Sequence, residues 1–585
     1  MKKIIIFLIL LIPINVEANY SESVVDVFSM NIYEIQEAVD RGYINYELLA
    51  KLYLERIETY ESSFNSIITL NENILEEARV KDIEYKKDGR ISILHGIPLI
   101  IKDNIDVLGM PTTAGSKALL KNYPLKNAEL VQKLIDQGAL VMAKSNMSEF
   151  AFSATNSYSS YGHVRNAYDM RYSSYGSSGG TAVAVALGFA TAGIGTDTNS
   201  SIRMPASAAA LVGLRPTYGS VSSEGIIPYD KERDVAGPIA RNSIDAAIIF
   251  QAISDDFSMD FKEDLSDYKI GVLVDFFQVD AKSSLKPYQA TYKPISDLMQ
   301  EMLNILVLEG AELIEIENLY NKYYDSIKNS TYSGVLFCYD FNQYIKGTEG
   351  PIKNYNDLLR GGGYIQNLSY YNVSCNYDLR NVRIKAINQK KDQFKEKLQA
   401  QMDSYGVDVL LYPTTKNRLI LLSESGANSM SSLFAPVTGM PAINLAIGFV
   451  DNLPYGMEVL ARHNEEALLL NIGNVIESNT LFYHLSKQAP MLYQVSEEKV
   501  VLKELYDQFY LNDEYQELNE KARKIFLNQL DFDSKIILDY KNHHVPIYES
   551  SFSFNVFDYE RYMPLTIVLS LIYTNFLVAL FNKRK

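Results

Sequence analysis

Two glycine- and serine-rich stretches and one lysine have the residue types and spacing to carry out a reaction. The stretches are Tyr175–Gly180 (YGSSGG) and Gly195–Ala206 (GTDTNSSIRMPA), and Lys102 lies upstream, directly after an apolar run. A serine hydroxyl is a poor nucleophile until a base takes its proton, and lysine can serve as that base if burial keeps it neutral. A second serine can relay the proton. The pattern therefore indicates nucleophilic hydrolysis of the Ser–Lys type.

Each of these features also has an ordinary structural interpretation. A loop rich in serine and glycine is typical of a turn, and a lysine beside Asp103 is typical of a surface ion pair. Residues 153–223 could even form a flexible linker. Within them, however, Thr181–Ala192 has the pattern of an apolar helix built of small residues, which allows close approach to other backbone. The combination favours a packed site wall over a linker.

Several motifs, taken in order, resemble those of the amidase signature family. The resemblance covers about residues 45–480 and is densest between His95 and Arg241. The motifs are GSSGG from Gly176, GTD from Gly195, SIRMPA from Ser201, GLRPTYG from Gly213, DVLLYPTT from Asp408 and LPYGMEVLAR from Leu453.

The resemblance implies roles for the three reactive residues. Ser201 aligns with the family nucleophile, Ser177 with the bridging serine that takes part in a cis peptide bond, and Lys102 with the general base. Neutral Lys102 would take a proton from Ser177 as Ser177 takes one from Ser201, which attacks the amide carbon. The amine would leave with the relayed proton, and water would then release the acid from the acyl-enzyme. The resemblance implies neither a cofactor nor a metal.

The turn before Ser201 is expected to stabilise the developing negative charge. By resemblance, an oxyanion hole would be formed by the backbone N–H groups of Thr198, Asn199, Ser200 and Ser201, and Asp197 with Arg203 would form a supporting ion pair. The family usually has glycine at three positions that here are Tyr175, Asn199 and Ser200. Asparagine tolerates positive φ better than most residues. The departure leaves open a membrane-tethered binding protein on a catalytically weak amidase scaffold.

Two further enzymes have overlapping motifs. Residues 176–180 also match G-x-S-x-G with Ser178 at the centre, the nucleophile elbow of α/β-hydrolases, which requires a downstream acid and then a histidine. The sequence has downstream histidines, namely His463, His484, His543 and His544, but no motif that links one of them to Ser178. The other alternative is the amidase subunit of a tRNA-dependent amidotransferase. A net charge of −16 argues against it, because an acidic surface repels nucleic acid.

Short apolar runs such as 99–101 and 139–143 alternate with helical stretches such as 128–137, which predicts an α/β fold. The resemblance implies a twisted mixed β-sheet flanked by helices on both faces. We assign residues 25–488 to this domain, with 290–405 as a helical insertion or cap, and 489–560 to a polar helical extension.

Both ends of the chain predict an exported protein. Residues 1–18 combine two lysines, a short apolar run and an A-x-A-like site, as in a secretory signal peptide. Residues 563–581 carry no charge and precede a basic tail, so they are expected to tether the protein to a membrane. Cys338 and Cys375 could pair, although nothing in their spacing demands it. The expected partner is a small-molecule amide substrate, not a nucleic acid.

Overall fold

The computed structural model describes residues 27–277, 291–329, 336–369, 377–424 and 433–479, with a few isolated residues besides. The chain divides into two compact units, Val27–Pro490 and a second formed by Met1–Asp26 with Met491–Lys585. The predicted signal peptide (1–18), nearly all of 489–560 and the predicted tether (563–581) lie outside the described residues. Among the helices that are described, none is long and apolar enough to cross a membrane.

The second unit contains one small antiparallel sheet in its described part. Its strand order is β1 (Ser23–Val24), β18 (Leu538–Asp539) and β17 (Gln494–Val495).

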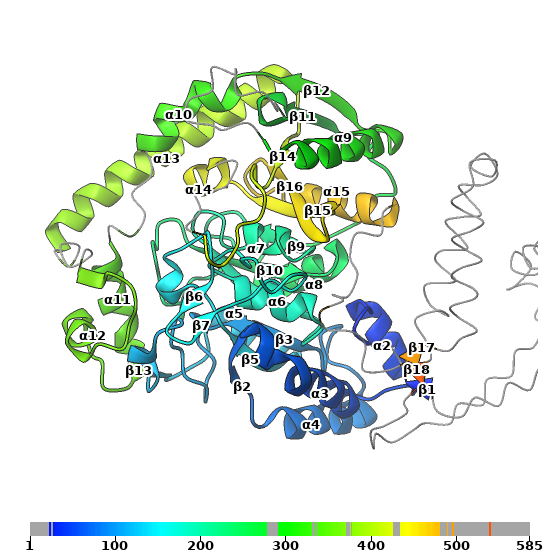
Figure 1. The fold of residues 1–585 in the computed structure, drawn as a ribbon, viewed down its shortest axis with the longest axis vertical. Coiled ribbons are helices and arrows are strands. Elements are labelled where there is room, and N and C mark those ends of the chain that lie inside the picture. Colours follow the sequence, from blue (N-terminus) through cyan, green and yellow to red (C-terminus); the bar gives the residue numbers. More distant parts are fainter. Residues whose placement is uncertain are drawn as a thin grey trace, which may run out of the picture. The chain divides into compact units, whose positions relative to one another are not determined.

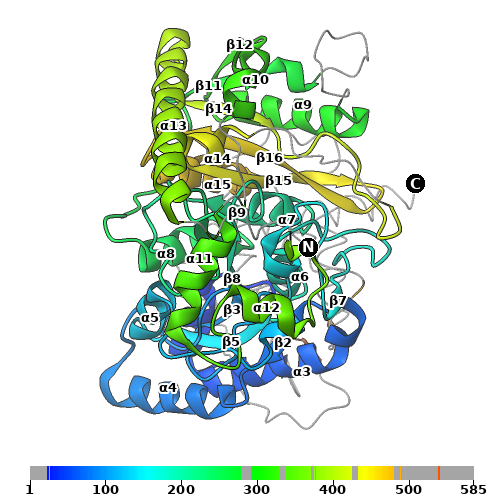
Figure 2. The same cartoon turned by 90° about the vertical axis from the view of Figure 1, so that its left-hand side faces the viewer.

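The Val27–Pro490 unit is built on an eleven-stranded mixed sheet (Figures 1 and 2). Strand β3 is parallel to β5 and β8, β11 is parallel to β12 and β14, and the other neighbours are antiparallel. This confirms the predicted α/β fold. From edge to edge the strands are β12 (Glu312–Ile316), β11 (Lys269–Leu273), β14 (Val409–Pro413), β16 (Leu453–Ala461), β15 (Ala442–Val450), β9 (Val212–Arg215), β10 (Val235–Ala240), β8 (Ala192–Asp197), β3 (Pro98–Lys102), β5 (Leu140–Ser145) and β2 (Ile67–Leu70).

Helices cover this sheet, and α3 and α4 lie beside β2 and β5 at one end (Figure 1). Helix α3 begins directly after Asn45, whose side chain caps it by accepting a hydrogen bond from Leu48 N at 2.7 Å. The covering helices are α2 (Ile32–Asp40), α3 (Tyr46–Phe64), α4 (Ile74–Asp88), α5 (Glu129–Asp136), α6 (Gly179–Ala186), α7 (Arg203–Ser207), α8 (Ser243–Ile253), α14 (Phe434–Thr438) and α15 (Glu466–Asn479).

The helix expected over residues 181–192 is shifted. Helix α6 begins at Gly179 and ends at Ala186, and Gly188 then turns the chain with φ of 69°. Residues from Ala192 onward form strand β8. Small apolar residues are compatible with both structures, and the glycine turn between them decides where one ends.

The region 290–405 is largely but not wholly helical, because β12 extends the main sheet. Helices α10 and α13 run side by side (Figure 1), and the rings of Tyr323 and Phe394 pack against each other between them. The other described elements of this region are α9 (Lys293–Leu308), α10 (Leu319–Asn329), α11 (Phe337–Tyr344), α12 (Tyr355–Gly361), α13 (Tyr377–Tyr405), the short strand β13 (Thr348–Glu349) and the 3₁₀ turn Ile345–Gly347. Outside it lie the short strands β4 (Tyr123–Pro124), β6 (Tyr158–Ser159) and β7 (Gly162–His163) and the 3₁₀ turns Lys117–Leu119, Glu149–Ala151 and Val274–Phe277.

The two cysteines are joined in a disulfide, Cys338–Cys375, with their Cα atoms 5.0 Å apart. Cys338 lies in α11, within an aromatic cluster where Phe337 packs against Phe150 and Phe152. Phe150 and Phe152 belong to the loop after β5, so the insertion packs directly against the sheet's own loops.

Candidate active site

The ends of two neighbouring strands bring the predicted reactive residues together. Strands β3 and β8 are parallel, with Ile101 opposite Ile194, so their carboxyl ends lie at the same edge of the sheet. Lys102 is the last residue of β3, and Thr196 and Asp197 end β8. Helix α6, which connects Ser177 to β8, contacts both strands. Open α/β sheets place their ligands at such an edge.

Lys102 is fully buried and is bound by oxygen atoms. Its Nζ donates to Ser177 Oγ at 2.7 Å, to Thr196 Oγ1 at 2.7 Å and to Thr196 O at 3.3 Å. Burial lowers the pKa of Lys102 to about 7, although the negative charges of Asp197 and Asp234 act in the opposite direction. A surface ion pair with Asp103 is therefore excluded, and a neutral amine is accessible near pH 7.

Close backbone contacts hold the segment around Ser177 in place. The Gly176–Ser177 peptide bond is cis, as the resemblance implies, and Tyr175 has a φ of 55°. Gly176 is required by close approach, since an added Cβ would lie 2.3 Å from Asn156 O. Ser177 O accepts from Ser148 N at 3.0 Å. These contacts hold the Ser177 hydroxyl where Lys102 can reach it.

Ser201 lies on the adjacent turn between β8 and α7 and is 5% exposed. Its carbonyl accepts from Ser178 N at 3.2 Å, which links the two serine segments. Among the hydrogen bonds of the described residues, however, none joins Ser201 Oγ to Ser177 Oγ. The structure therefore brings Lys102 and Ser177 into direct contact and leaves the second step of the relay without a hydrogen bond.

Ser178, the alternative nucleophile, has its hydroxyl engaged by backbone. It donates to Thr196 O at 3.1 Å and accepts from Thr196 N at 3.2 Å. Among the histidines within the described residues, none bonds to it. His95, for example, is bonded to Lys81 O. His484, His543 and His544 lie outside the described part of the chain. Ser178 is thus a connector between the GSSGG segment and β8.

The turn predicted to form an oxyanion hole has backbone N–H groups available to a ligand. Within the described residues, the N–H groups of Thr198, Ser200 and Ser201 meet no acceptor. Asn199 and Ser200 are not among the residues with positive φ, whereas Tyr175 is. The tolerance of asparagine for positive φ is therefore not needed at residue 199, and side chains at 199 and 200 are compatible with this turn.

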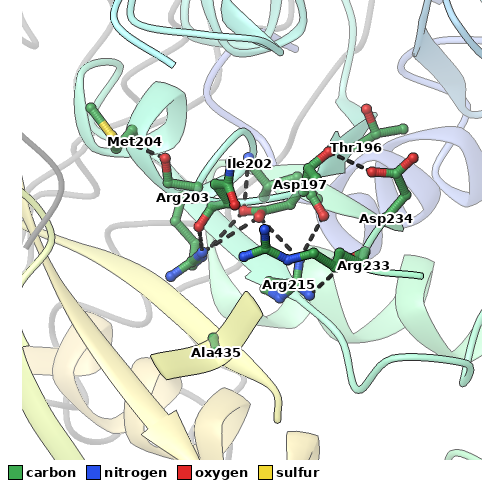
Figure 3. A network of polar contacts seen from close by, with 12 residues as sticks. Thr196, Asp197, Ile202, Arg203, Met204, Arg215, Arg233, Asp234 and Ala435 are labelled. Atoms are coloured by element: carbon green, nitrogen blue, oxygen red, sulfur yellow. Dashed lines mark hydrogen bonds and ion pairs between the residues drawn. The ribbon is translucent and has the colours of Figure 1, made fainter. Parts of the chain in front are cut away.

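The supporting ion pair Asp197–Arg203 is part of a larger buried network (Figure 3). Asp197 Oδ2 lies 3.2 Å from Arg203 Nε, and Oδ1 lies 3.0 Å from Arg215 Nη1. Arg203 also pairs with Glu458 and donates to Asn199 O. Burial alone would raise the pKa of Asp197, but the two guanidinium groups outweigh it and lower that pKa to about 2. The network ties the turn to β9 and β16.

Sequence reasoning had assigned no role to several of these residues. Arg215 and Glu458 lie inside quoted motifs, and Tyr412 OH donates to Glu458 Oε1 at 2.7 Å from the neighbouring strand. A charged residue inside an apolar strand, such as Glu458, is the signal that could have identified them, because a buried charge requires a partner.

A small pocket lies beside Thr196, which binds Lys102. Asp234 contributes a partly buried carboxylate there, bound by Thr198 Oγ1 at 2.5 Å. The loss of hydration inside the protein raises the pKa of Asp234. The described residues contain no group of three or more His, Cys, Asp or Glu side chains arranged to hold a metal ion. The pocket is lined by Asn104, Ala151, Thr196, Thr198, Ser223, Ile226, Tyr229, Asp234 and Val235.

Comparison with known proteins gives consistent results. The family model Amidase matches residues 48–470. A glutamyl-tRNA(Gln) amidotransferase subunit from Caldanaerobacter subterraneus subsp. tengcongensis is 30% identical over 487 residues, covering 77% of this chain and 96% of that protein. The corresponding protein from Thermoanaerobacter pseudethanolicus is 29% identical over 498 residues, covering 78% and 98%.

Solved structures show the same relationship. The native peptide amidase of Stenotrophomonas maltophilia superposes with a TM-score of 0.67 at 27% identity, covering 78% of this chain and 99% of that one. Because the family model spans most of the chain and the fold superposes on that of a solved amidase, the protein belongs to the amidase signature family of hydrolases.

Proposed function

We propose that this protein hydrolyses a carboxylic amide to an acid and an amine or ammonia, with Ser201 as nucleophile, Ser177 as proton relay and Lys102 as base. One observation carries the proposal. The Nζ of fully buried Lys102 lies 2.7 Å from Ser177 Oγ, and burial lowers the pKa of Lys102 to about 7. A lysine with this pKa can take a proton at neutral pH and return it during the same cycle.

The proposed reaction has two steps. Ser201 Oγ attacks the amide carbon and passes its proton to Ser177, whose own proton goes to Lys102. The C–N bond breaks as Ser177 gives one proton to the leaving nitrogen and takes one back from Lys102, which gives an acyl-enzyme and a free amine. Water then attacks the ester in the same way, and the acid leaves with Ser201 restored. The relay requires Ser201 Oγ to rotate toward Ser177 when substrate binds.

The oxyanion that forms in each step needs donors already in place. Thr198, Ser200 and Ser201 offer backbone N–H groups without acceptors among the described residues, which suits this role. The proposed task of Arg203 is positional, since it holds Asn199 O and Asp197 at the two ends of the turn. Asp197 stays ionised between two arginines and does not take part in proton transfer.

Activity profiling against an amide library tests the proposal, combined with labelling by a fluorophosphonate probe. Ser201→Ala should abolish both hydrolysis and labelling, whereas Ser478→Ala, at an exposed serine of α15, should change neither. Labelling that persists in Ser201→Ala would reject Ser201 as nucleophile. Wild-type protein that is neither labelled nor active would favour a binding protein on an inactive scaffold.

A second candidate is the amidase subunit of an amidotransferase. It is favoured by the match to nearly the full length of subunits that bear that name. Such a subunit would release ammonia from an amide for transfer to a tRNA-bound acid, a role that the net charge of −16 does not favour. Ammonia release from glutamine by the isolated chain, stimulated by added charged tRNA and partner subunits, would support it. Hydrolysis of other amides without any partner would support the first candidate.

A further inference from the structure

The pocket beside Thr196 contains one buried hydrogen-bond acceptor that lacks a donor. Asn104 is buried and donates through Nδ2 to Thr196 Oγ1 at 3.2 Å and to Ile227 O at 3.3 Å. These two contacts fix the amide orientation, because a flipped amide would place its oxygen against the Ile227 carbonyl. Asn104 Oδ1 then meets no donor among the described residues. A buried acceptor without a donor is costly in a native protein and points to a ligand.

Asp234 lies in the same pocket and is hydrogen-bonded but not charge-paired. Its Oδ1 accepts from Thr198 Oγ1 at 2.5 Å, and its Oδ2 accepts from Tyr229 N at 2.8 Å and Asp230 N at 3.0 Å. Within the described residues no side chain forms an ion pair with it. Lys102 and Arg233 act on it only through space, and Lys102 must lose its charge to serve as the base.

The rest of the pocket lining disfavours the binding of a ligand that carries a carboxylate. Lysine and arginine are absent from the described residues that line it, and Ala151, Ile226 and Val235 form its apolar part. A carboxylate bound there would face Asp234 without a cation to offset the repulsion. An ammonium would instead supply the charge that Asp234 lacks and the N–H donors that Asn104 Oδ1 lacks.

We propose that this pocket is a subsite for a positively charged amine on the substrate, with Asp234 as its ion-pair partner and Asn104 Oδ1 as a second acceptor. The inference rests on the proposed function, because it places that amine beside the reacting amide. The substrate class is then an amide that carries a free amino group, and amides of acids with a second carboxylate are rejected.

Direct binding to the full chain carrying Ser201→Ala tests the subsite without requiring turnover. Three small primary amides serve as probes in calorimetry near pH 7: glycinamide with an ammonium, propionamide with a methyl group in its place, and the slightly larger malonamate with a carboxylate. We expect glycinamide to bind about tenfold more tightly than propionamide, and malonamate most weakly. Equal affinities for the three probes would overturn the proposal.

Variants then assign the preference to Asp234. Adding Asp234→Asn should reduce the glycinamide-over-propionamide ratio to about one. Adding Asp260→Asn, at an exposed carboxylate outside the pocket, should leave the ratio unchanged. Thr198→Val removes the hydroxyl bonded to Asp234 but keeps the carboxylate, so the ratio should persist even if overall affinity falls. A ratio that survives Asp234→Asn would contradict the proposal, and if Asp234→Asn fails to fold, the three-probe series in Ser201→Ala decides it.

The two hypotheses fail separately. If wild-type protein hydrolyses no amide while glycinamide still binds selectively through Asp234, the proposed function is wrong and the subsite stands. If amides are hydrolysed but the three probes bind equally, the proposed function stands and the subsite is wrong.

Discussion

Two lysines on neighbouring strands are both fully buried but have different surroundings. Lys102 ends β3 and Lys144 lies on β5, where it is opposite Ile101. Lys144 Nζ lies 3.5 Å from Asp103 Oδ1 and is bonded to Thr112 Oγ1 at 3.2 Å. Lys102 has hydroxyl and carbonyl ligands and no ion pair within the described part of the chain.

These surroundings decide which buried lysine can act as a base. Burial lowers the pKa of both, and carboxylates oppose this at both. The difference is that Asp103 forms an ion pair with Lys144, whereas Asp197 and Asp234 act on Lys102 only through space. An adjacent anion stabilises the protonated amine, whereas hydroxyl ligands accept a hydrogen bond without supplying a full charge. We infer that Lys144 has a structural role in its ion pair with Asp103, and that Lys102, which is hydrogen-bonded to Ser177, is the lysine placed to accept a proton from a serine.

The largest expected effect is on turnover. Replacing Lys102 by methionine removes the proposed base, so kcat/KM should fall about 10³–10⁴-fold for the best amide found by profiling. The free energy of unfolding should fall less than in Lys144→Met, because no ion pair is broken, although Ser177 Oγ and Thr196 O lose a donor. Rate measurements and thermal unfolding of the same sample check both statements. Full activity in Lys102→Met would end the proposed mechanism.

Lys144→Met should have the opposite profile. It leaves Asp103 buried and without its cation, so the free energy of unfolding should fall by about 3–5 kcal/mol. Denaturant unfolding at neutral pH measures the loss. The double variant Asp103→Asn with Lys144→Met is the matched control and should recover part of it, because the orphaned charge is gone. A loss of turnover without loss of stability in Lys144→Met would break the comparison.

The pH dependence of kcat/KM tests the pKa of Lys102 directly. Since burial lowers the pKa of Lys102 from its usual value to about 7, the neutral base is the major form above that pH and the charged form below it. We therefore expect kcat/KM to rise about tenfold per pH unit below 7 and to level off above it. The measurement is a pH–rate profile between the limits of stability. A profile that keeps rising toward pH 10 would mean that Lys102 has an ordinary pKa.

Local motifs were enough to propose the candidate site residues, whereas the surroundings of the site could not be predicted from the sequence. Motifs led to Lys102, Ser177 and Ser201 as candidates. Strands β3 and β5 were visible in the sequence as short apolar runs. Motifs can be recognised from the local order of residues, without knowledge of the fold. The proposed roles of Asn104, which follows β3, and Asp234, which precedes β10, depend on β3, β8 and β10 lying side by side, which local order does not specify.

The limits of helix α6 and the strand in the insertion were missed for a related reason. Small apolar residues such as those of 181–192 fit helix and strand equally well, so the glycine turn at 188 had to be seen in place. Strand β12 follows helix α9 by a short turn in a charged, tyrosine-rich region, and its pairing with β11 decides its structure. In both regions tertiary contacts determine the result.

The smallest expected effect concerns the oxyanion turn. Replacing Asn199 and Ser200 by glycine restores the residues usual in the family, yet neither position has positive φ and the backbone N–H groups stay in place. Turnover should therefore change by no more than about threefold, while each glycine costs roughly 0.5–1 kcal/mol through added freedom of the unfolded chain. Rates and unfolding of the double variant measure both. A large gain in turnover would show that the turn's side chains, and not the environment of Lys102, limit this enzyme, and the contrast between the two buried lysines would no longer explain its reactivity.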